Sequence, residues 1–218
     1  LQIAGIQRSL SPKNLKLPLL VLKAYLKAKG IIKKHQPQVV IGVGGYASGP
    51  TLFAANKAKI PTLLQEQNAF AGVTNKILGK KARKVCVAYT GMEKFFAASK
   101  IIDTGNPVRS NILNITATQN EGQQFFKLEN KPTLLIIGGS LGARKVNECI
   151  HQDWKQFIDQ GGQVIWQTGK WYYDAHQQAL ESIQHNNLVV VPFIKDMDMA
   201  YAASDVVISR AGALSISE

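Results

Sequence analysis

Short apolar segments alternate along the chain with longer segments of helical length. Seven of the apolar segments, rich in valine and isoleucine, are predicted to be strands: residues 38–43, 61–64, 84–88, 133–137, 163–167, 188–191 and 205–209. Most are continuously apolar, which is typical of strands buried on both faces of a parallel sheet. The pattern therefore predicts an α/β protein built from repeated βαβ units.

The alternation breaks once, in the polar stretch between Asn111 and Pro132, which follows the turn sequence Gly105-Asn106-Pro107. We expect a second domain to begin there, so the predicted domains are residues 1–111 and 112–218, both Rossmann-like. Two such domains form a cleft between them, and open α/β sheets bind ligands at the carboxyl ends of their strands. Because the chain starts at Leu1 and stops in an expected helical turn, we expect a fragment in which both domains are truncated.

Charge is distributed unevenly between the predicted domains. Residues 1–111 hold 18 Lys and Arg against 3 Asp and Glu, whereas the whole chain holds 26 against 14. The first domain is thus strongly basic, and the second is slightly acidic. An anionic partner is expected for the first domain only, and nucleic acid, anionic lipid and a phosphorylated substrate all fit that description.

Two glycine-rich segments each follow a predicted strand and open a predicted helix. The first runs from Gly42 to Pro50 and the second from Ile137 to Arg144. Glycine lets backbone N–H groups approach a ligand, and a helix N-terminus favours an anion. Each segment also has a simpler interpretation, a tight turn in the first and an N-cap at Ser140 in the second.

A third segment, 209–218 (SRAGALSISE), also follows a predicted strand, and its serines and its acid could hold a phosphate and a sugar hydroxyl. The alternative is a capping box with Ser215 as the cap and Glu218 three residues later.

The polar run 65–68 (QEQN) at another strand end has groups suited to sugars. Asp196-Met197-Asp198 has the D-x-D spacing of some metal sites, but we interpret it as a helix cap with first-turn acids. We expect neither a metal nor a cofactor.

The segment 15–35 is expected to be a basic helix with more apolar residues than one buried face needs. Lys16, Lys23, Lys27 and Lys34 fall on one helical stripe, at about 100° per residue. A neighbouring stripe of Leu15, Leu19, Leu22 and Leu26 is expected to pack on the sheet. A basic helix with surplus apolar residues is typical of binding to an anionic membrane surface, although a solvated lysine face is the alternative.

The order of six segments resembles the MurG family of bacterial glycosyltransferases. These segments are GVGGYASGP, QEQNAFAGVTNK, GNPVR, GGSLGAR, PFIKDM and SRAGALSISE, and they span residues 38–218. The resemblance implies a GT-B fold, with two Rossmann-like domains and an interdomain cleft. It implies a hexosyltransferase of peptidoglycan synthesis that moves N-acetylglucosamine from UDP-N-acetylglucosamine to lipid I and gives lipid II. It also implies a peripheral enzyme at the cytoplasmic face of the inner membrane.

The same resemblance assigns residues to two ligands. The residues that would hold UDP-N-acetylglucosamine are Asn68, Arg109, Ser140, Ile194, Ala213, Leu214, Ser215, Ile216, Ser217 and Glu218. Those of the acceptor and phosphate loop are Gly44, Gly45, Tyr46, Ser48 and Gln67. No catalytic residue is assigned, because the proposed general base would lie upstream of Leu1. Two residues depart from the family pattern: Gln65 stands where histidine is common, and Leu141 where glutamine is common.

Three other functions remain as alternatives. Another GT-B enzyme that acts on a glycolipid, or a UDP-N-acetylglucosamine epimerase, would share the sheets and the nucleotide site. A nucleic-acid-binding protein would explain the positive charge. The basic stretch lacks interleaved aromatic residues, however, and no nucleic-acid-binding module is recognised, so nucleic acid is not an expected partner.

Overall fold

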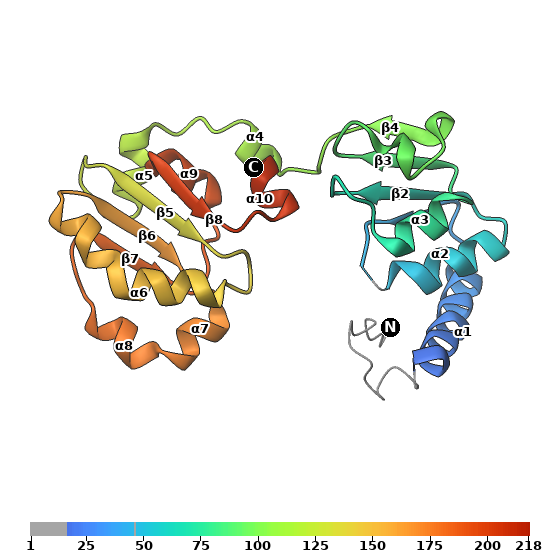
Figure 1. Ribbon diagram of the computed structural model, residues 1–218, viewed down its shortest axis with the longest axis horizontal. Helices are drawn as coiled ribbons and strands as arrows, with labels where there is room; N and C mark the ends of the chain where they lie inside the picture. Colours follow the sequence, from blue (N-terminus) through green and yellow to red (C-terminus); the bar gives the residue numbers. More distant parts are fainter. Residues whose placement is uncertain (1–16, 46) are drawn as a thin grey trace. The chain divides into compact units, whose positions relative to one another are not determined.

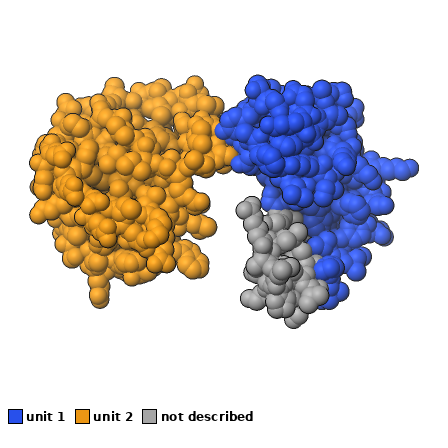
Figure 2. All heavy atoms as spheres, viewed as in Figure 1, with its two compact units in different colours: residues 1–106 blue, residues 107–218 orange. Residues whose placement is uncertain are grey.

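The computed structural model describes residues 17–45 and 47–218, so Leu15, Lys16 and Tyr46 lie outside the described residues. The chain forms two compact units, Leu1–Asn106 and Pro107–Glu218 (Figure 2). The division lies five residues before the one predicted at 111/112, and it assigns Arg109 to the second unit. Each unit is an α/β structure with its own parallel sheet.

The first unit contains a sheet with the strand order β1-β2-β3-β4 (Figure 1). Its elements, in chain order, are α1 (Leu17–His35), β1 (Val40–Gly42), α2 (Ser48–Lys57), β2 (Thr62–Glu66), α3 (Val73–Gly79), β3 (Lys84–Val87), the 3-10 helices Met92–Lys94 and Ala98–Lys100, and β4 (Ile101–Asp103). The register pairs Gly42 with Leu64 and Glu66 with Val87. The loops that follow β1 and β2 therefore leave the sheet at the same edge.

One face of the first sheet packs on a core, and the other is open among the described residues. Leu64, Val85 and Val87 are buried in the core, whereas Ile41 and Ile102 are 59% and 41% exposed. The prediction of strands buried on both faces is therefore wrong for β1 and β4, whereas β2 fits it, since Leu64 and Gln65 on its opposite faces are both buried. No described helix covers Ile41 and Ile102.

Helix α1 packs on α2 through the face that carries Ala24, Ala28 and Ile32. Ala24, Ala28 and Ile32 are buried, and Ala28 and Ile32 share a cluster with Ala54 and Ala55 of α2. Leu19, Leu22 and Leu26 are 57%, 52% and 56% exposed. The expectation that the leucine stripe packs on the sheet is therefore wrong, because the alanine face permits a closer approach to the alanines of α2.

The second unit contains a sheet with the strand order β7-β6-β5-β8. Its elements are α4 (Ser110–Leu113), α5 (Gln119–Phe125), β5 (Thr133–Ile137), α6 (Arg144–Asp159), β6 (Gln163–Gln167), α7 (Lys170–Ala175), α8 (Gln177–Ser182), β7 (Leu188–Val191), α9 (Met197–Ala203), β8 (Val206–Ser209) and α10 (Ala213–Ser217). The chain goes from β5 to β6 on one side and returns to β8 on the other. This reversal between β5 and β8 is the kind of position at which open α/β sheets bind ligands.

The central strands of the second sheet are buried on both faces, as predicted. Leu135, Ile137 and Ile165 face a core that includes α9, and Ile136 and Trp166 face a core that includes α6. The edge strand β8 differs, since Val206, Val207 and Ile208 are all at least 40% exposed.

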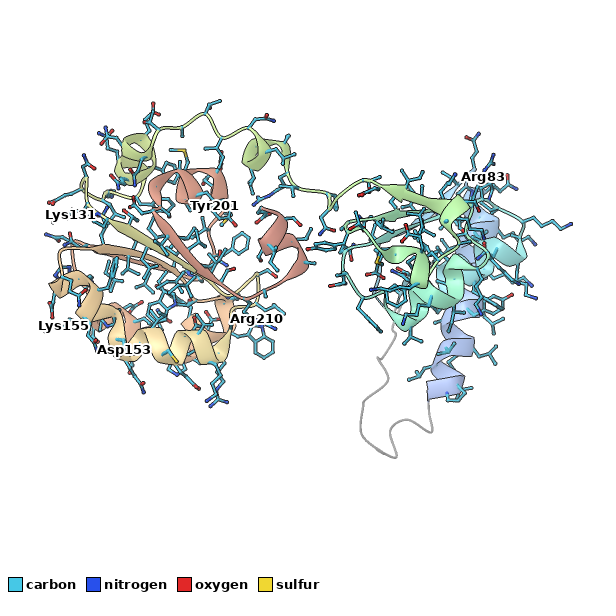
Figure 3. The ribbon with its side chains drawn as sticks, turned by 45° about the horizontal axis from the view of Figure 1, so that its top comes forward. Arg83, Lys131, Asp153, Lys155, Tyr201 and Arg210 are labelled. Atoms are coloured by element: carbon cyan, nitrogen blue, oxygen red, sulfur yellow. The ribbon has the colours of Figure 1, made fainter. Side chains whose placement is uncertain are left out.

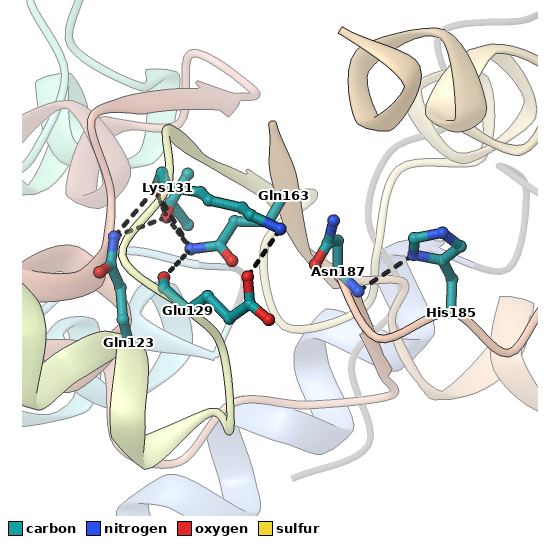
Figure 4. A network of polar contacts seen from close by, with 7 residues as sticks. Gln123, Glu129, Lys131, Gln163, His185 and Asn187 are labelled. Carbon is teal, nitrogen blue, oxygen red and sulfur yellow. Dashed lines mark hydrogen bonds and ion pairs between the residues drawn. The ribbon is translucent and has the colours of Figure 1, made fainter. Parts of the chain in front are cut away.

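A network of buried amides fixes the amino edge of the second sheet (Figure 4). The Gln163 Nε2 atom donates to Thr133 Oγ1 at 2.7 Å and to the Glu129 carbonyl at 2.8 Å. The Gln123 Nε2 atom donates to the same Thr133 hydroxyl at 3.0 Å. These bonds hold the starts of β5 and β6 together, at the opposite end from the loops that carry the predicted ligand residues.

All seven predicted strands are present, within a few residues of their predicted bounds. β4 was not predicted, because it has only three residues and is mostly exposed at the sheet edge, so little apolar sequence marks it.

Candidate nucleotide-sugar site

The loop after β5 carries Ser140 in an exposed turn before a long helix. Gly139 and Gly142 have φ values of +79° and +77°, a left-handed conformation that favours glycine. The N-cap of α6 is Ala143, and no side chain caps the helix. The interpretation of Ser140 as an N-cap is therefore wrong. Ser140 stands three residues before the cap of α6, and no side-chain hydrogen bond caps that helix start.

This loop packs tightly against the end of β6. A Cβ atom added to Gly142 would lie 2.0 Å from the Thr168 carbonyl oxygen, and one added to Gly169 would lie 2.4 Å from the Gly142 nitrogen. The Asn147 Nδ2 atom, from α6, donates to the same Thr168 carbonyl at 2.6 Å. The glycines thus allow two backbone segments to touch, which fixes the shape of the loop around Ser140.

Leu141, which departs from the family pattern, projects outward from this loop. Leu141 is 73% exposed, and it borders a hollow of about 400 Å³ that Arg144, Trp171 and Tyr172 also line. An apolar side chain there provides no hydrogen bond to a ligand.

Ile194 lies in the connection between β7 and α9. Its side chain is buried in the core beside Met197 and Ala200. Its backbone N–H donates to Gln167 Oε1 at 2.9 Å. The main chain at Ile194 is therefore held firmly in place.

The third motif forms β8 and the short helix α10. The N-cap of α10 is Gly212, and Ser215 lies inside the helix, so the predicted capping box of Ser215 and Glu218 is wrong. The run from Ala213 to Ser217 forms α10 itself and brings Glu218 to its C-terminal end. The Ser217 hydroxyl donates to the Ala213 carbonyl.

Glu218 joins two other polar side chains within the second unit. The Arg109 Nη2 atom lies 3.9 Å from Glu218 Oε1, and the Tyr201 hydroxyl donates to Glu218 Oε2 at 3.2 Å. Tyr201 belongs to α9 (Figure 3). Burial, together with the charge and the hydrogen bond of the Glu218 carboxylate, raises the pKa of Tyr201 to about 12. Tyr201 therefore stays protonated at neutral pH and remains a donor to Glu218.

In the first unit, the glycine-rich loop after β1 is tied to the end of β2. Gly44 and Gly45 have φ values of +88° and +75°. The Ser48 hydroxyl donates to the Gly44 carbonyl, and the Gln67 Nε2 atom donates to the Val43 carbonyl at 2.9 Å. The structure thus brings Gly44, Ser48 and Gln67 together. Tyr46 is outside the described residues.

Glu66 organises the loop that contains Asn68. Its carboxylate is buried and accepts hydrogen bonds from the Asn68 N–H and Nδ2 at 3.1 Å each, the Gly72 N–H at 3.0 Å and the Asn75 Nδ2 at 2.9 Å. The pattern of the sequence does not indicate this role for Glu66. The one available signal is an acid close to the end of a predicted apolar strand.

The Gly105-Asn106-Pro107 turn closes against the same loop. The Gln65 Nε2 atom donates to the Gly105 carbonyl at 3.0 Å, and the Asn106 Nδ2 atom donates to the Gln67 carbonyl at 3.2 Å. Gln65 therefore has a structural contact at the position where the family often has histidine.

Helix α1 presents both lysines and leucines to the surface. Lys23, Lys27 and Lys34 are exposed, and the exposed Leu19, Leu22 and Leu26 lie beside them on the helix. Among the helices of residues 17–45 and 47–218, none has the length and apolar content needed to span a bilayer.

The Asp196-Met197-Asp198 segment begins α9, as predicted. Asp196 is the N-cap residue and Asp198 lies in the first turn, although the Asp196 side chain makes no capping hydrogen bond. Its position at a helix start explains the spacing of the two acids.

Two glycine-bearing strand-to-helix loops on separate parallel sheets define the class of protein. Residues 1–87 match the glycosyltransferase family 28 N-terminal domain, and residues 133–218 match the glycosyltransferase family 28 C-terminal domain. The chain belongs to glycosyltransferase family 28, with the α/β organisation of GT-B enzymes.

Within that family, the chain is similar to enzymes named UDP-N-acetylglucosamine–N-acetylmuramyl-(pentapeptide) pyrophosphoryl-undecaprenol N-acetylglucosamine transferase. It is 50% identical to the one from Cytophaga hutchinsonii over 219 residues, and 52% identical to the one from Bacteroides fragilis over 225 residues. Each alignment covers 100% of this chain and 58% of the relative. The chain thus spans a little over half the length of these relatives.

Comparison with solved structures also finds a MurG enzyme among the similar proteins. The chain matches the crystal structure of Acinetobacter baumannii MurG with a TM-score of 0.61 and 32% identity, over 98% of this chain and 57% of that one. It also matches a UDP-GlcNAc 2-epimerase from Neisseria meningitidis with a TM-score of 0.64, but with 13% identity, over 95% of this chain and 62% of that one. The second match shows a shared fold and nothing more.

Proposed function

We propose that this chain carries much of an inverting glycosyltransferase that moves N-acetylglucosamine from UDP-N-acetylglucosamine to the C4 hydroxyl of the muramyl sugar of lipid I. The product is lipid II, for peptidoglycan synthesis. The observation that carries the proposal is the identity of about half of all positions, through both units, with relatives that bear this activity in their names. The domain roles follow: acceptor and membrane binding for the first unit, donor binding for the second.

The donor is proposed to bind along the carboxyl edge of the second sheet. Ser140 and the N-terminus of α6 would face the diphosphate, because the helix dipole and unpaired N–H groups attract an anion. The main chain at Ile194 would meet the uracil, and Glu218 would accept hydrogen bonds from the ribose hydroxyls. Support comes from the chain topology, since the Ser140 loop and α10 follow β5 and β8, the strands on either side of the reversal.

The proposed chemistry is a single displacement. The acceptor C4 oxygen forms a bond to the anomeric carbon while the bond from that carbon to the β-phosphate oxygen breaks, and UDP leaves. The hydroxyl proton would pass to a general base, a role that is not assigned to any residue of this chain. Negative charge that develops on UDP would be stabilised by the α6 N-terminus and by Arg109, which can form charge-assisted hydrogen bonds to phosphate.

Arg109→Ala in the full-length protein tests the donor assignment. We expect kcat/KM for UDP-N-acetylglucosamine to fall by roughly a hundredfold, because a charged donor to the leaving group is lost. Lys131→Ala is the control, since Lys131 pairs with Glu129 at the amino edge of the same sheet. Unchanged turnover together with unchanged donor affinity in Arg109→Ala would remove Arg109 from the site.

The alternative enzymes are separated by the acceptor requirement. A UDP-N-acetylglucosamine epimerase would convert the donor with no acceptor present, whereas the proposed transferase would leave it unchanged. A transferase specific for another glycolipid would fail with lipid I and succeed with its own acceptor.

We also propose that α1 docks on the anionic cytoplasmic surface of the inner membrane, as a peripheral contact. The exposed leucines would enter the interface, and Lys16, Lys23, Lys27 and Lys34 would approach the lipid phosphates. Support comes from the burial pattern, because α1 meets α2 with its alanine face and leaves Leu19, Leu22 and Leu26 exposed.

Replacement of these four lysines by glutamine tests the membrane contact. We expect binding to phosphatidylglycerol vesicles to weaken by roughly fivefold per residue, at about 1 kcal/mol each, while UDP binding is retained. The control replaces four lysines of the second unit, Lys127, Lys131, Lys145 and Lys155, in the same way. Equal vesicle binding by the α1 variant and the wild type would refute the contact.

A further inference from the structure

Gln167 connects two loops of the second unit that are far apart in the sequence. It is the last residue of β6, and its side chain is buried, with 4% of the residue exposed. Its Nε2 atom donates to the Gly139 carbonyl at 3.1 Å, and its Oε1 atom accepts the Ile194 N–H at 2.9 Å. One amide group therefore bridges the loop after β5 and the loop after β7.

The two bridged loops are those proposed to hold the two ends of the nucleotide. Gly139 precedes Ser140, which we assign to the diphosphate, and Ile194 is assigned to the base. We propose that Gln167 is a positioning residue that sets the spacing between the diphosphate and uracil subsites. The inference rests on the proposed function of the site. It adds a residue that need not touch the ligand.

Further hydrogen bonds hold the end of β6, which carries Gln167, in place. The Thr168 N–H donates to the Val191 carbonyl at 3.0 Å, and Asn147 holds the Thr168 carbonyl. The Asn147 Oδ1 atom in turn accepts from Trp166 Nε1 at 3.0 Å. Because the strand end is fixed on both sides, the Gln167 amide has few alternative positions, and the two loops that bind to it have few as well.

A spacing role predicts a particular pattern of binding losses. UDP spans both subsites, so its affinity depends on their separation. Uridine and inorganic pyrophosphate each resemble one end of UDP and need only one subsite. Removal of the bridge should therefore weaken UDP much more than either of the shorter probes, whereas general loosening of the unit would weaken all three.

The experiment compares these three probes on Gln167→Met and Gln167→Asn in the full-length protein. Methionine keeps the length and apolar volume but loses both hydrogen bonds. Asparagine keeps the amide but is one methylene shorter, so it cannot reach both loops, and it provides the test if the methionine variant does not fold. Gln163→Met is the matched control: Gln163 is a buried glutamine at the other end of the same strand, also bonded to main-chain carbonyls.

We expect the dissociation constant for UDP, measured by calorimetry, to rise about tenfold in both Gln167 variants. The constants for uridine and pyrophosphate, measured by ligand-observed NMR, should change less than about twofold. Gln163→Met should lower thermal stability without changing the ratio of UDP to uridine affinity. Equal losses for all three probes, or no loss for UDP, would overturn the spacing role. Absence of UDP binding by the wild type would instead contradict the proposed function.

Discussion

At the carboxyl edge of the first sheet, a buried acid fixes the one loop that follows β2, whereas at the same edge of the second sheet a buried amide joins two loops. Glu66 is 2% exposed, and its carboxylate accepts hydrogen bonds from four N–H donors of its own unit. Gln67 beside it is half-buried, and its side chain makes a single hydrogen bond to the glycine-rich loop, at the Val43 carbonyl. In the second unit Gln167 is buried and makes two hydrogen bonds, one to each loop, whereas the side chain of the acid Glu218 is 19% exposed.

The comparison shows that residue type does not by itself separate scaffold from ligand contact. A buried carboxylate must be satisfied by internal donors, since an unsatisfied one costs several kcal/mol. Glu66 therefore cannot serve a ligand without loss of its loop. Among the described residues, Glu218 accepts one hydrogen bond, from Tyr201, and pairs with Arg109 at 3.9 Å, so its carboxylate can still accept further hydrogen bonds.

The largest expected difference between the two units is in the free energy of unfolding that is lost when a loop glycine is replaced by alanine. Gly142→Ala would place a Cβ atom 2.0 Å from the Thr168 carbonyl at a φ of +77°, whereas Gly45→Ala at +75° would meet nothing within 4 Å. We expect Gly142→Ala to lower the free energy of unfolding by about 3 kcal/mol or more, from clash and conformation together. Gly45→Ala should cost about 1–2 kcal/mol, from conformation alone. Urea unfolding measures both values.

Gly139→Ala serves as the control within the second unit. Its φ is +79° and an added Cβ would meet nothing within 4 Å, so it should resemble Gly45→Ala. Similar costs for Gly142→Ala and Gly139→Ala would show that the contact with Thr168 does not constrain the loop.

Replacement of the two acids should give smaller effects, which differ in kind: one variant should lose stability and the other UDP affinity. Glu66→Gln replaces an acceptor oxygen by an NH₂ group that faces other donors, so it should lower the free energy of unfolding by roughly 1–3 kcal/mol. Glu218→Gln should cost less, about 1 kcal/mol, because its amide oxygen can still accept the Tyr201 hydroxyl. It should instead weaken UDP binding by about two- to tenfold, through the ribose contact.

Calorimetry on both variants measures thermal stability and UDP affinity side by side. If Glu66→Gln were as stable as the wild type, or Glu218→Gln bound UDP unchanged, the division between scaffold and ligand residues would be incorrect.

Much of the fold was accessible from the sequence. Continuous apolar segments mark β5 and β6 because the interior of a sheet covered on both faces accepts only such residues. The glycine loops were visible because a tight strand-to-helix turn needs residues that tolerate positive φ. β4 was not visible, because an exposed edge strand needs little apolar sequence.

The site was predicted less completely. Its order of motifs indicated the family, and Ser140, Arg109 and Glu218 were named from that likeness. Glu66 and Gln167 were not named as structural ties, because their roles depend on which backbone groups approach them from loops distant in the sequence. The capping interpretations of Ser140 and Ser215 failed because helix starts are decided by the turn geometry before them.

By itself, the sequence determined the alternation of strands and helices, the excess positive charge of the first half and the glycine positions. These follow from local conformational preference and from the need to bury apolar area. Only the tertiary structure decided which face of α1 is buried and which polar side chain at each strand end is enclosed. The reason is physical: the helical period of α1 permits either its alanines or its leucines to pack, and the close fit between α1 and α2 selects the alanines.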